Sequence, residues 1–187
     1  MILKMDGPKT KQEFAEMVKQ NKYRFGAEIG VRAGEMAELI LQSQAVSAYY
    51  LVDPWCHQPE NQYHAEVNYS QEGHDQNYEW TLEKIKPFEG RAIIMRMYSH
   101  EAAQKIPDKS LDWVYIDANH CYKNMTQDLQ LWTPKVKSGF MIAGHDFLDL
   151  NFPDRFGVKT AVAEFFTEDQ IIHTSNTEWP IWWTIKS

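Results

Sequence analysis

The sequence predicts an α/β domain in which a mostly parallel, seven-stranded sheet has helices on both faces. Apolar strand-like segments alternate with segments of helical periodicity over most of the 187 residues. The strand-like segments are continuous apolar runs, as expected when helices cover both faces of a sheet. The last two strands follow one another without a helix, so we expect one of them to be an antiparallel edge strand.

The first half of the chain contains three helices and three strands. Thr10 followed by Glu13 has the spacing of a helix-capping box, and an apolar face follows it. The first strand ends at a glycine, and Asp53-Pro54 stops the second. We expect helices over residues 10–21, 35–44 and 78–86, and strands over 27–31, 49–52 and 92–97. Residues 55–77 lack sustained periodicity, and we expect a lid or insertion there.

The second half continues the alternation until its final pair of strands. We expect helices over residues 101–105, 121–132 and 158–166, and strands over 113–116, 140–143, 171–174 and 181–185. No linker of Pro, Gly or Ser divides the chain, so residues 1–187 are expected to form a single domain. Trp179, Trp182 and Trp183 are expected to pack in the core or on an edge strand.

Composition excludes several classes of function. Hydrophobic residues make up 43% of the chain, which is typical of a globular protein, and the net charge is -7. Such a surface repels phosphate backbones and anionic lipid, so we expect neither nucleic acid nor membrane as a partner. Cys56 and Cys121 lie far apart without zinc-site spacing, and the amino terminus lacks a signal-like apolar run. These features predict a cytoplasmic protein whose short chain and aromatic ends would permit a homodimer.

Polar residues after the first two strands predict a nucleoside site. Ligands of open α/β sheets bind beyond the carboxyl ends of the strands. Gly30 and Gly34 would let the backbone turn tightly there, and Asp53 could accept hydrogen bonds from ribose hydroxyls. A tight turn without a ligand and a turn-forming aspartate would explain the same residues. Together they favour an adenosine-containing ligand without separating NAD from S-adenosylmethionine.

The segment from Glu28 to Gly34 resembles the first motif of class I S-adenosylmethionine-dependent methyltransferases, which have a Rossmann-like fold. Arg32 stands where a dinucleotide-binding loop needs a glycine to admit pyrophosphate, a group that S-adenosylmethionine lacks. By this resemblance Glu28 holds the methionine end and Asp53 holds the ribose. The resemblance also places other residues beside the cofactor, with all but the last flanking the adenine: Pro54, Trp55, Ser99, His100 and Asp117.

A second resemblance concerns Asp117-x-x-His120-x-Tyr122 and the later strand that ends in His145-Asp146-Phe147. This pattern resembles the small-molecule and sugar O-methyltransferases (methyltransferase family 24-like), which are related to catechol O-methyltransferases. The resemblance covers roughly residues 26–166.

The catechol-type relatives bind a divalent metal, which by position implies Asp117, His145 and Asp146 as ligands here. The relatives have an Asp-Asn pair at the last two positions, so this chain departs from their pattern. Carboxylates suit Mg or Ca, whereas an imidazole would favour Mn. The same residues could instead form a metal-free acid/base cluster.

The sulfonium of S-adenosylmethionine is already an activated methyl donor, so the protein must align an acceptor and remove a proton. His120 and His145 are the candidate bases, with Asp117 as the third catalytic candidate. We therefore expect an O-methyltransferase for a small hydroxylated acceptor, either a sugar or a catechol-like compound. The alternatives are an NAD-linked Rossmann-fold enzyme and a non-catalytic S-adenosylmethionine-binding module.

Overall fold

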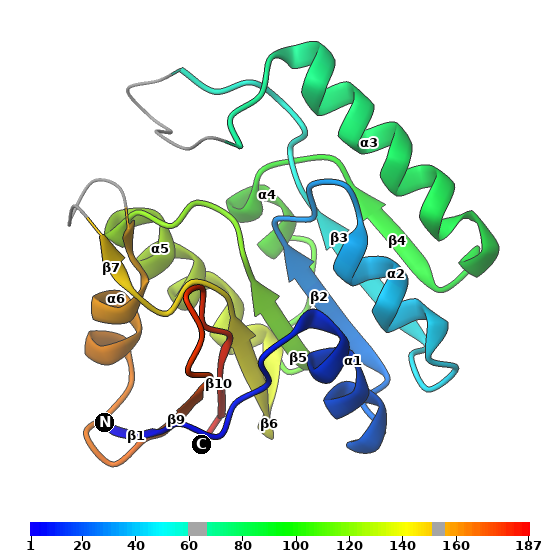
Figure 1. The fold of residues 1–187 in the computed structure, drawn as a ribbon. Coiled ribbons are helices and arrows are strands. Elements are labelled where there is room, and N and C mark those ends of the chain that lie inside the picture. The colour runs from blue at the N-terminus through cyan, green and yellow to red at the C-terminus, as the bar shows by residue number, and fades with distance from the viewer. Residues whose placement is uncertain (60–66, 151–155) are drawn as a thin grey trace.

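The computed structural model describes residues 1–59, 67–150 and 156–187, and its centre is one eight-stranded sheet (Figure 1). The strand order is β1-β9-β10-β6-β5-β2-β3-β4. The strands are β1 (Ile2–Lys4), β2 (Phe25–Ile29), β3 (Ala48–Val52), β4 (Ala92–Met95), β5 (Leu111–Ile116), β6 (Val136–Gly144), β9 (Ile171–Thr174) and β10 (Trp182–Ile185). A separate two-stranded hairpin pairs β7 (Asp149–Leu150) with β8 (Phe156–Gly157).

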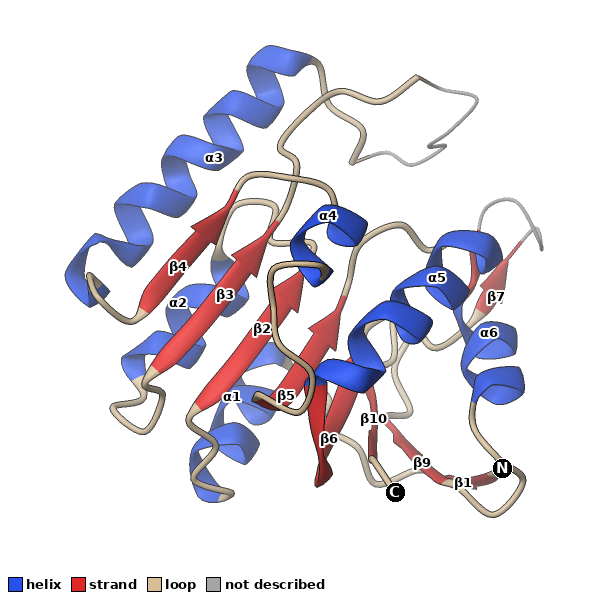
Figure 2. Ribbon diagram, turned by 180° about the vertical axis from the view of Figure 1, so that it is seen from behind, coloured by secondary structure: helices blue, strands red, loops and turns tan. Residues whose placement is uncertain are grey.

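Helices cover both faces of the sheet, as the continuous apolar strands predict (Figures 1 and 2). One face packs against α1 (Lys11–Gln20), α2 (Glu35–Gln42) and α3 (Gln71–Ile85), which continues into the short helix η1 (Lys86–Phe88). The other face packs against α4 (Ser99–Ala103), α5 (Tyr122–Trp132) with η2 (Thr133–Lys135), and α6 (Val158–Phe165). The central strand β5 is buried at every position, with alternate side chains in the two cores.

The predicted fold class is confirmed, with two differences in the sheet. β2 to β6 are parallel to one another, whereas β10 is antiparallel to both β6 and β9. The antiparallel strand therefore lies inside the sheet, and the prediction that it forms the edge was wrong. The edge is β1, which pairs in parallel with β9 and brings the strand count to eight. β1 has three exposed residues, too few to produce a periodic signal.

Two helices begin earlier than the periodicity indicates. α3 begins at Gln71 rather than at residue 78, because the Ser70 side chain accepts from the Gly73 N–H and starts the helix in a mostly polar segment. The expected irregular segment 55–77 therefore ends in a helix, and its residues 60–66 lie outside the described residues. α4 begins at Ser99 rather than at residue 101. The predicted cap of α1 is confirmed, since Thr10 Oγ1 accepts from Glu13 N at 3.1 Å.

The strand order reverses between β2 and β5. From β2 the chain proceeds to β3 and β4 on one side, and then returns to β5 and β6 on the other. Ligands of open α/β sheets bind at this reversal, beyond the carboxyl ends of the strands. Within the described residues, no helix is both long enough and apolar enough to span a bilayer.

Candidate functional site

Residues 30–34, which follow β2 and are called the glycine loop below, require glycine at two positions. Gly30 has a φ of +90°, and a Cβ there would lie 2.1 Å from the carbonyl oxygen of Asp117. Gly34 has a φ of +75° at the start of α2, where a Cβ would lie 3.2 Å from Thr81. Arg32 also has a positive φ, of 54°, in the region that only glycine adopts without strain. The loop therefore makes a tight turn directly against the end of β5.

Asp53 holds this loop from the neighbouring strand. Its Oδ2 accepts from the backbone N–H groups of Val31, at 2.9 Å, and Arg32, at 3.0 Å. Its Oδ1 accepts from Trp55 N at 2.7 Å. Burial raises the pKa of Asp53, and these three hydrogen bonds act in the opposite direction. The structure thus brings together the glycine loop and the carboxylate that the sequence singles out.

Side chains from α3 and Trp55 hold the loop from its carbonyl side. Trp55 Nε1 donates to Arg32 O at 2.7 Å, and Thr81 Oγ1 donates to the same oxygen at 3.2 Å. Lys84 Nζ donates to Ala33 O at 2.7 Å. Sequence reasoning missed Thr81 and Lys84, because the fit of their helix against the loop has no local motif.

Glu28 lies on β2, where its buried side chain contacts the Tyr49 hydroxyl. Its side chain is 2% exposed, and Tyr49 Oη donates to Glu28 Oε2 at 3.0 Å. Burial raises the pKa of Glu28 to about 8, with Lys11 and the Tyr49 hydrogen bond acting in the opposite direction. The hydroxyl of Tyr115, on β5, is also buried and has no hydrogen-bond partner within the described residues. An ionisable group and an unsatisfied hydroxyl therefore lie at the reversal point.

The residues expected around adenine lie in different environments. Trp55 is 1% exposed and packs edge-on against Tyr78, so in this conformation its ring offers no free face to a base. The Ser99 hydroxyl donates to the Asp128 carboxylate and accepts from Trp132 Nε1 at 2.8 Å. Pro54 is half-buried, and His100 is exposed and stacks on Tyr98.

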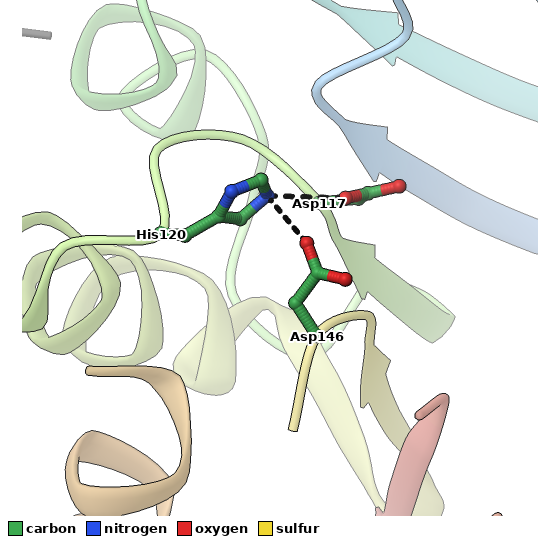
Figure 3. A group of neighbouring side chains, drawn as sticks. All are labelled: Asp117, His120 and Asp146. Atoms are coloured by element: carbon green, nitrogen blue, oxygen red, sulfur yellow. Dashed lines mark hydrogen bonds and ion pairs between the residues drawn. The ribbon is translucent and has the colours of Figure 1, made fainter. Parts of the chain in front are cut away.

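Four residues that follow β5 and β6 form the acid/imidazole cluster: Asp117, His120, His145 and Asp146. Figure 3 draws Asp117, His120 and Asp146. His120 Nε2 lies 3.3 Å from Asp117 Oδ1 and 3.2 Å from Asp146 Oδ2. His145 Nδ1 lies 2.8 Å from Asp146 Oδ1 and 3.9 Å from Asp117 Oδ1. Asp117 follows β5 and Asp146 follows β6, which are parallel neighbours. The structure brings these four side chains together, and their roles in catalysis or metal binding stay predictions.

Mutual contacts set the ionisation of this cluster. Burial alone would raise the pKa of Asp117, but the hydrogen bond with His120 and the charge of His145 outweigh it and lower this pKa. Burial alone would lower the pKa of His145, but the hydrogen bond to Asp146 and the charge of Asp117 raise it. These contacts therefore favour the ionised form of Asp117 and the protonated form of His145.

The geometry selects a different third ligand from the one the resemblance implies. One ligand atom each from Asp117, His120 and Asp146 lies within 4.8 Å of the others, as a shared cation requires. His145 instead directs Nδ1 toward Asp146. Two carboxylates and one imidazole form a donor set that fits a divalent ion such as Mn²⁺ or Mg²⁺.

Comparisons with known proteins identify the family and the fold. A family model described as "Methyltransferase domain" matches residues 27–147, from β2 to just beyond Asp146. No curated protein matches the chain.

Solved structures share the fold at low sequence identity. An O-methyltransferase from Bacillus cereus in complex with SAH has a TM-score of 0.68 and 13% identity, covering 96% of this chain and 82% of the other. The N-methyltransferase NodS from Bradyrhizobium japonicum has a TM-score of 0.63 and 10% identity, covering 94% of each chain. A methyltransferase from Geobacter sulfurreducens has a TM-score of 0.65 and 9% identity, covering 98% and 81%. With its family model matched over more than half of its length, the chain belongs to this methyltransferase family.

Proposed function

We propose that the protein transfers a methyl group from S-adenosylmethionine to the oxygen of a small hydroxylated acceptor. The choice of methyl donor rests on the hydrogen bonds that the backbone of the glycine loop already makes. Two of the N–H groups that could bind a pyrophosphate already donate to Asp53. Glu28, Asp117 and Asp146 add further carboxyl groups around the strand reversal. Such an environment suits a cationic sulfonium better than an anionic dinucleotide.

The acid/imidazole cluster supplies the acceptor side of the proposal. An acceptor oxygen attacks the methyl carbon, the carbon–sulfur bond breaks, and its electron pair goes to sulfur, leaving neutral S-adenosylhomocysteine. The hydroxyl proton passes to the His120 imidazole in this scheme. Asp117 and Asp146 each have an oxygen within 3.3 Å of His120 Nε2, where it can accept a hydrogen bond, and they stabilise the resulting imidazolium.

A divalent metal is the alternative way to activate the acceptor at the same residues. Asp117, Asp146 and His120 would hold it, and when bound it would lower the pKa of an acceptor hydroxyl. A transfer assay with and without a chelator separates this arrangement from the metal-free one. Loss of activity with the chelator, restored by Mn²⁺ or Mg²⁺, would assign His120 as a ligand rather than the base.

The decisive experiment combines donor binding with single-turnover transfer. We expect calorimetry to detect S-adenosylmethionine but not NAD. In the metal-free arrangement, His120→Gln is expected to lower kcat by about 10²- to 10⁴-fold while the donor dissociation constant changes little. His173→Gln, on β9 and outside the acid/imidazole cluster, is the matched control and should keep wild-type turnover. Binding of NAD in place of S-adenosylmethionine, or a fully active His120→Gln variant, would overturn the respective part of the proposal.

A further inference from the structure

The first turn of α1 lies beside the strand reversal. Only residues 21–24 separate the end of α1 from the start of β2, and the helix runs opposite to that strand (Figure 1). The ring of Phe14 packs against Tyr115 on β5 with centroids 4.7 Å apart. Lys11 is the first residue of α1 and precedes Phe14 by three positions. Its side chain therefore leaves the same helix face about one turn nearer the carboxyl ends of the strands.

The positive charge of Lys11 acts on ionisable groups around the strand reversal. Burial raises the pKa of Glu28 to about 8, and the charge of Lys11 is the largest effect that opposes this rise. The same charge is a lesser influence on the pKa values of Asp117 and His145, for which burial is the largest influence. Lys11 is half-buried, and its ammonium group has no hydrogen-bond or ion-pair partner within residues 1–59, 67–150 and 156–187. It is thus a cation near several acids without a direct partner among the described side chains.

A second polar group near the same acids lacks a partner. The Tyr115 side chain is buried, and its hydroxyl makes no hydrogen bond within the described part of the chain. Burial raises the pKa of Tyr115 well above its ordinary value, and the charges of Asp117 and Glu28 raise it further. The hydroxyl therefore lies near two of the carboxyl groups that the charge of Lys11 reaches. Unpartnered donors of this kind, an ammonium and a hydroxyl, favour the binding of an anionic group.

We infer that Lys11 binds the carboxylate at the methionine end of S-adenosylmethionine, and that it makes the protein select donors carrying this group. The inference rests on the proposed methyl transfer and adds a residue that determines specificity for the donor. The methionine end is a zwitterion, with an ammonium and a carboxylate on the same carbon atom. By the resemblance Glu28 holds this end, so its carboxyl group can take the ammonium while Lys11 supplies the opposite charge for the carboxylate.

The position of Lys11 favours the carboxylate of the donor over a carboxylate on the acceptor. Its charge ranks second among the influences on the pKa of Glu28, which belongs to the donor side of the proposed site. The same charge ranks only fourth for Asp117, which belongs to the acid/imidazole cluster on the acceptor side.

Calorimetry with S-adenosylmethionine and with its decarboxylated form tests this inference. We expect the wild type to bind S-adenosylmethionine about 10- to 100-fold more tightly, the factor expected for one hydrogen bond between charged groups. Lys11→Met keeps the length of the side chain and should remove most of this preference by weakening the binding of S-adenosylmethionine alone. Lys11→Arg keeps the charge and should retain the preference. Lys19→Met is the matched control, because it removes a charge from the exposed last turn of α1, where Lys19 pairs with Glu16.

The two ligands distinguish recognition of the carboxylate from a general effect of the charge. If Lys11→Met weakens the binding of both ligands by the same factor, Lys11 acts on the fold or on the overall field, and the inference is overturned. Unchanged binding of S-adenosylmethionine by Lys11→Met, or a loss of equal size in Lys19→Met, would also overturn it. In each case the proposed methyl donor stands, because the wild type still binds it.

Methylthioadenosine, which has the nucleoside but lacks the amino-acid end, separates this inference from the proposed function. If the wild type binds methylthioadenosine as tightly as S-adenosylmethionine, the protein does not recognise the amino-acid end. The inference about Lys11 is then overturned, while the nucleoside site and the proposed methyl transfer stand. If the wild type binds neither compound, the proposed methyl transfer fails together with the inference.

Discussion

Asp53 shows how one side chain can hold a binding loop before any ligand arrives. A carboxylate offers about four lone-pair sites, and three backbone N–H groups of the protein occupy three of them. The remaining site is available for one ribose hydroxyl, which fits the role that the resemblance implies. Asp53 would then serve two purposes, fixing the glycine loop and contacting the cofactor from the same atoms.

Glu28 is expected to make cofactor binding dependent on pH. Its pKa of about 8 means that it is mostly protonated at pH 7 in the free protein. The positive charges of S-adenosylmethionine would favour the ionised form, so binding should lower this pKa and release a proton. Affinity should therefore rise with pH between about 6 and 8, by at most about tenfold per unit.

Calorimetry at pH 6, 7 and 8 measures this dependence for the wild type and Glu28→Gln. The glutamine variant cannot release the proton, so its affinity should change less over the same range. S-adenosylhomocysteine, which lacks the sulfonium charge, serves as the matched ligand and should give a shallower slope with the wild type. Parallel slopes for wild type and variant would place the proton release elsewhere.

At the scale of elements, a buried polar link joins α4 to α5. Ser99 donates to Asp128, which is 6% exposed, and burial raises the pKa of Asp128 to about 6 from its ordinary 3.8, with the Ser99 hydrogen bond acting in the opposite direction. The folded protein thus binds this proton more tightly than the unfolded chain does. The free energy of unfolding should therefore fall as pH rises from about 4 to about 6, and level off above that, by about 3 kcal/mol in total.

Urea unfolding of the wild type and Asp128→Asn at pH 4 and pH 7 isolates this contribution. Asparagine keeps an acceptor for Ser99 but does not titrate, so the variant should gain stability relative to the wild type on going from pH 4 to pH 7. Using the difference between the two proteins removes the titration of all other groups. A constant difference at both pH values would show that Asp128 does not titrate in this window.

The sequence predicts the position of an element well where a long apolar segment forms it. The prediction is poor where the start of the element depends on a single side-chain contact. The interior strands β2, β3, β5 and β6 overlap the apolar segments that predict them, although each begins one to four residues earlier than predicted. β1 has three residues, and the first half of α3 depends on the Ser70 cap and on contacts with the glycine loop. Neither signal is local enough to be read from spacing.

At the scale of the molecule, topology explains which parts of the candidate site were predictable. Parallel neighbouring strands bring their carboxyl ends to one edge, so polar residues just after β5 and β6 must meet there. Which imidazole lies close enough to share a cation with the two aspartates depends on side-chain directions. In the structure it is His120, whereas the resemblance implies His145, and the metal ligands stay a prediction. The stacking of Phe156 on His120 depends on the β7–β8 hairpin, which is distant in sequence, so no motif could reveal it.

Because the residues around the strand reversal belong to or follow β2, β3, β5 and β6, a cofactor bound there should stabilise the fold as a whole. A ligand that binds only the folded state at 100 times its dissociation constant adds about 2.7 kcal/mol to the free energy of unfolding. For a chain of 187 residues this corresponds to a rise in Tm of about 5–10 °C. Thermal unfolding with S-adenosylhomocysteine should show this rise, and the same concentration of NAD should leave Tm unchanged. Equal shifts with both would mean that the Asp53-bound loop can open to admit a pyrophosphate, and would remove the argument for a cationic donor.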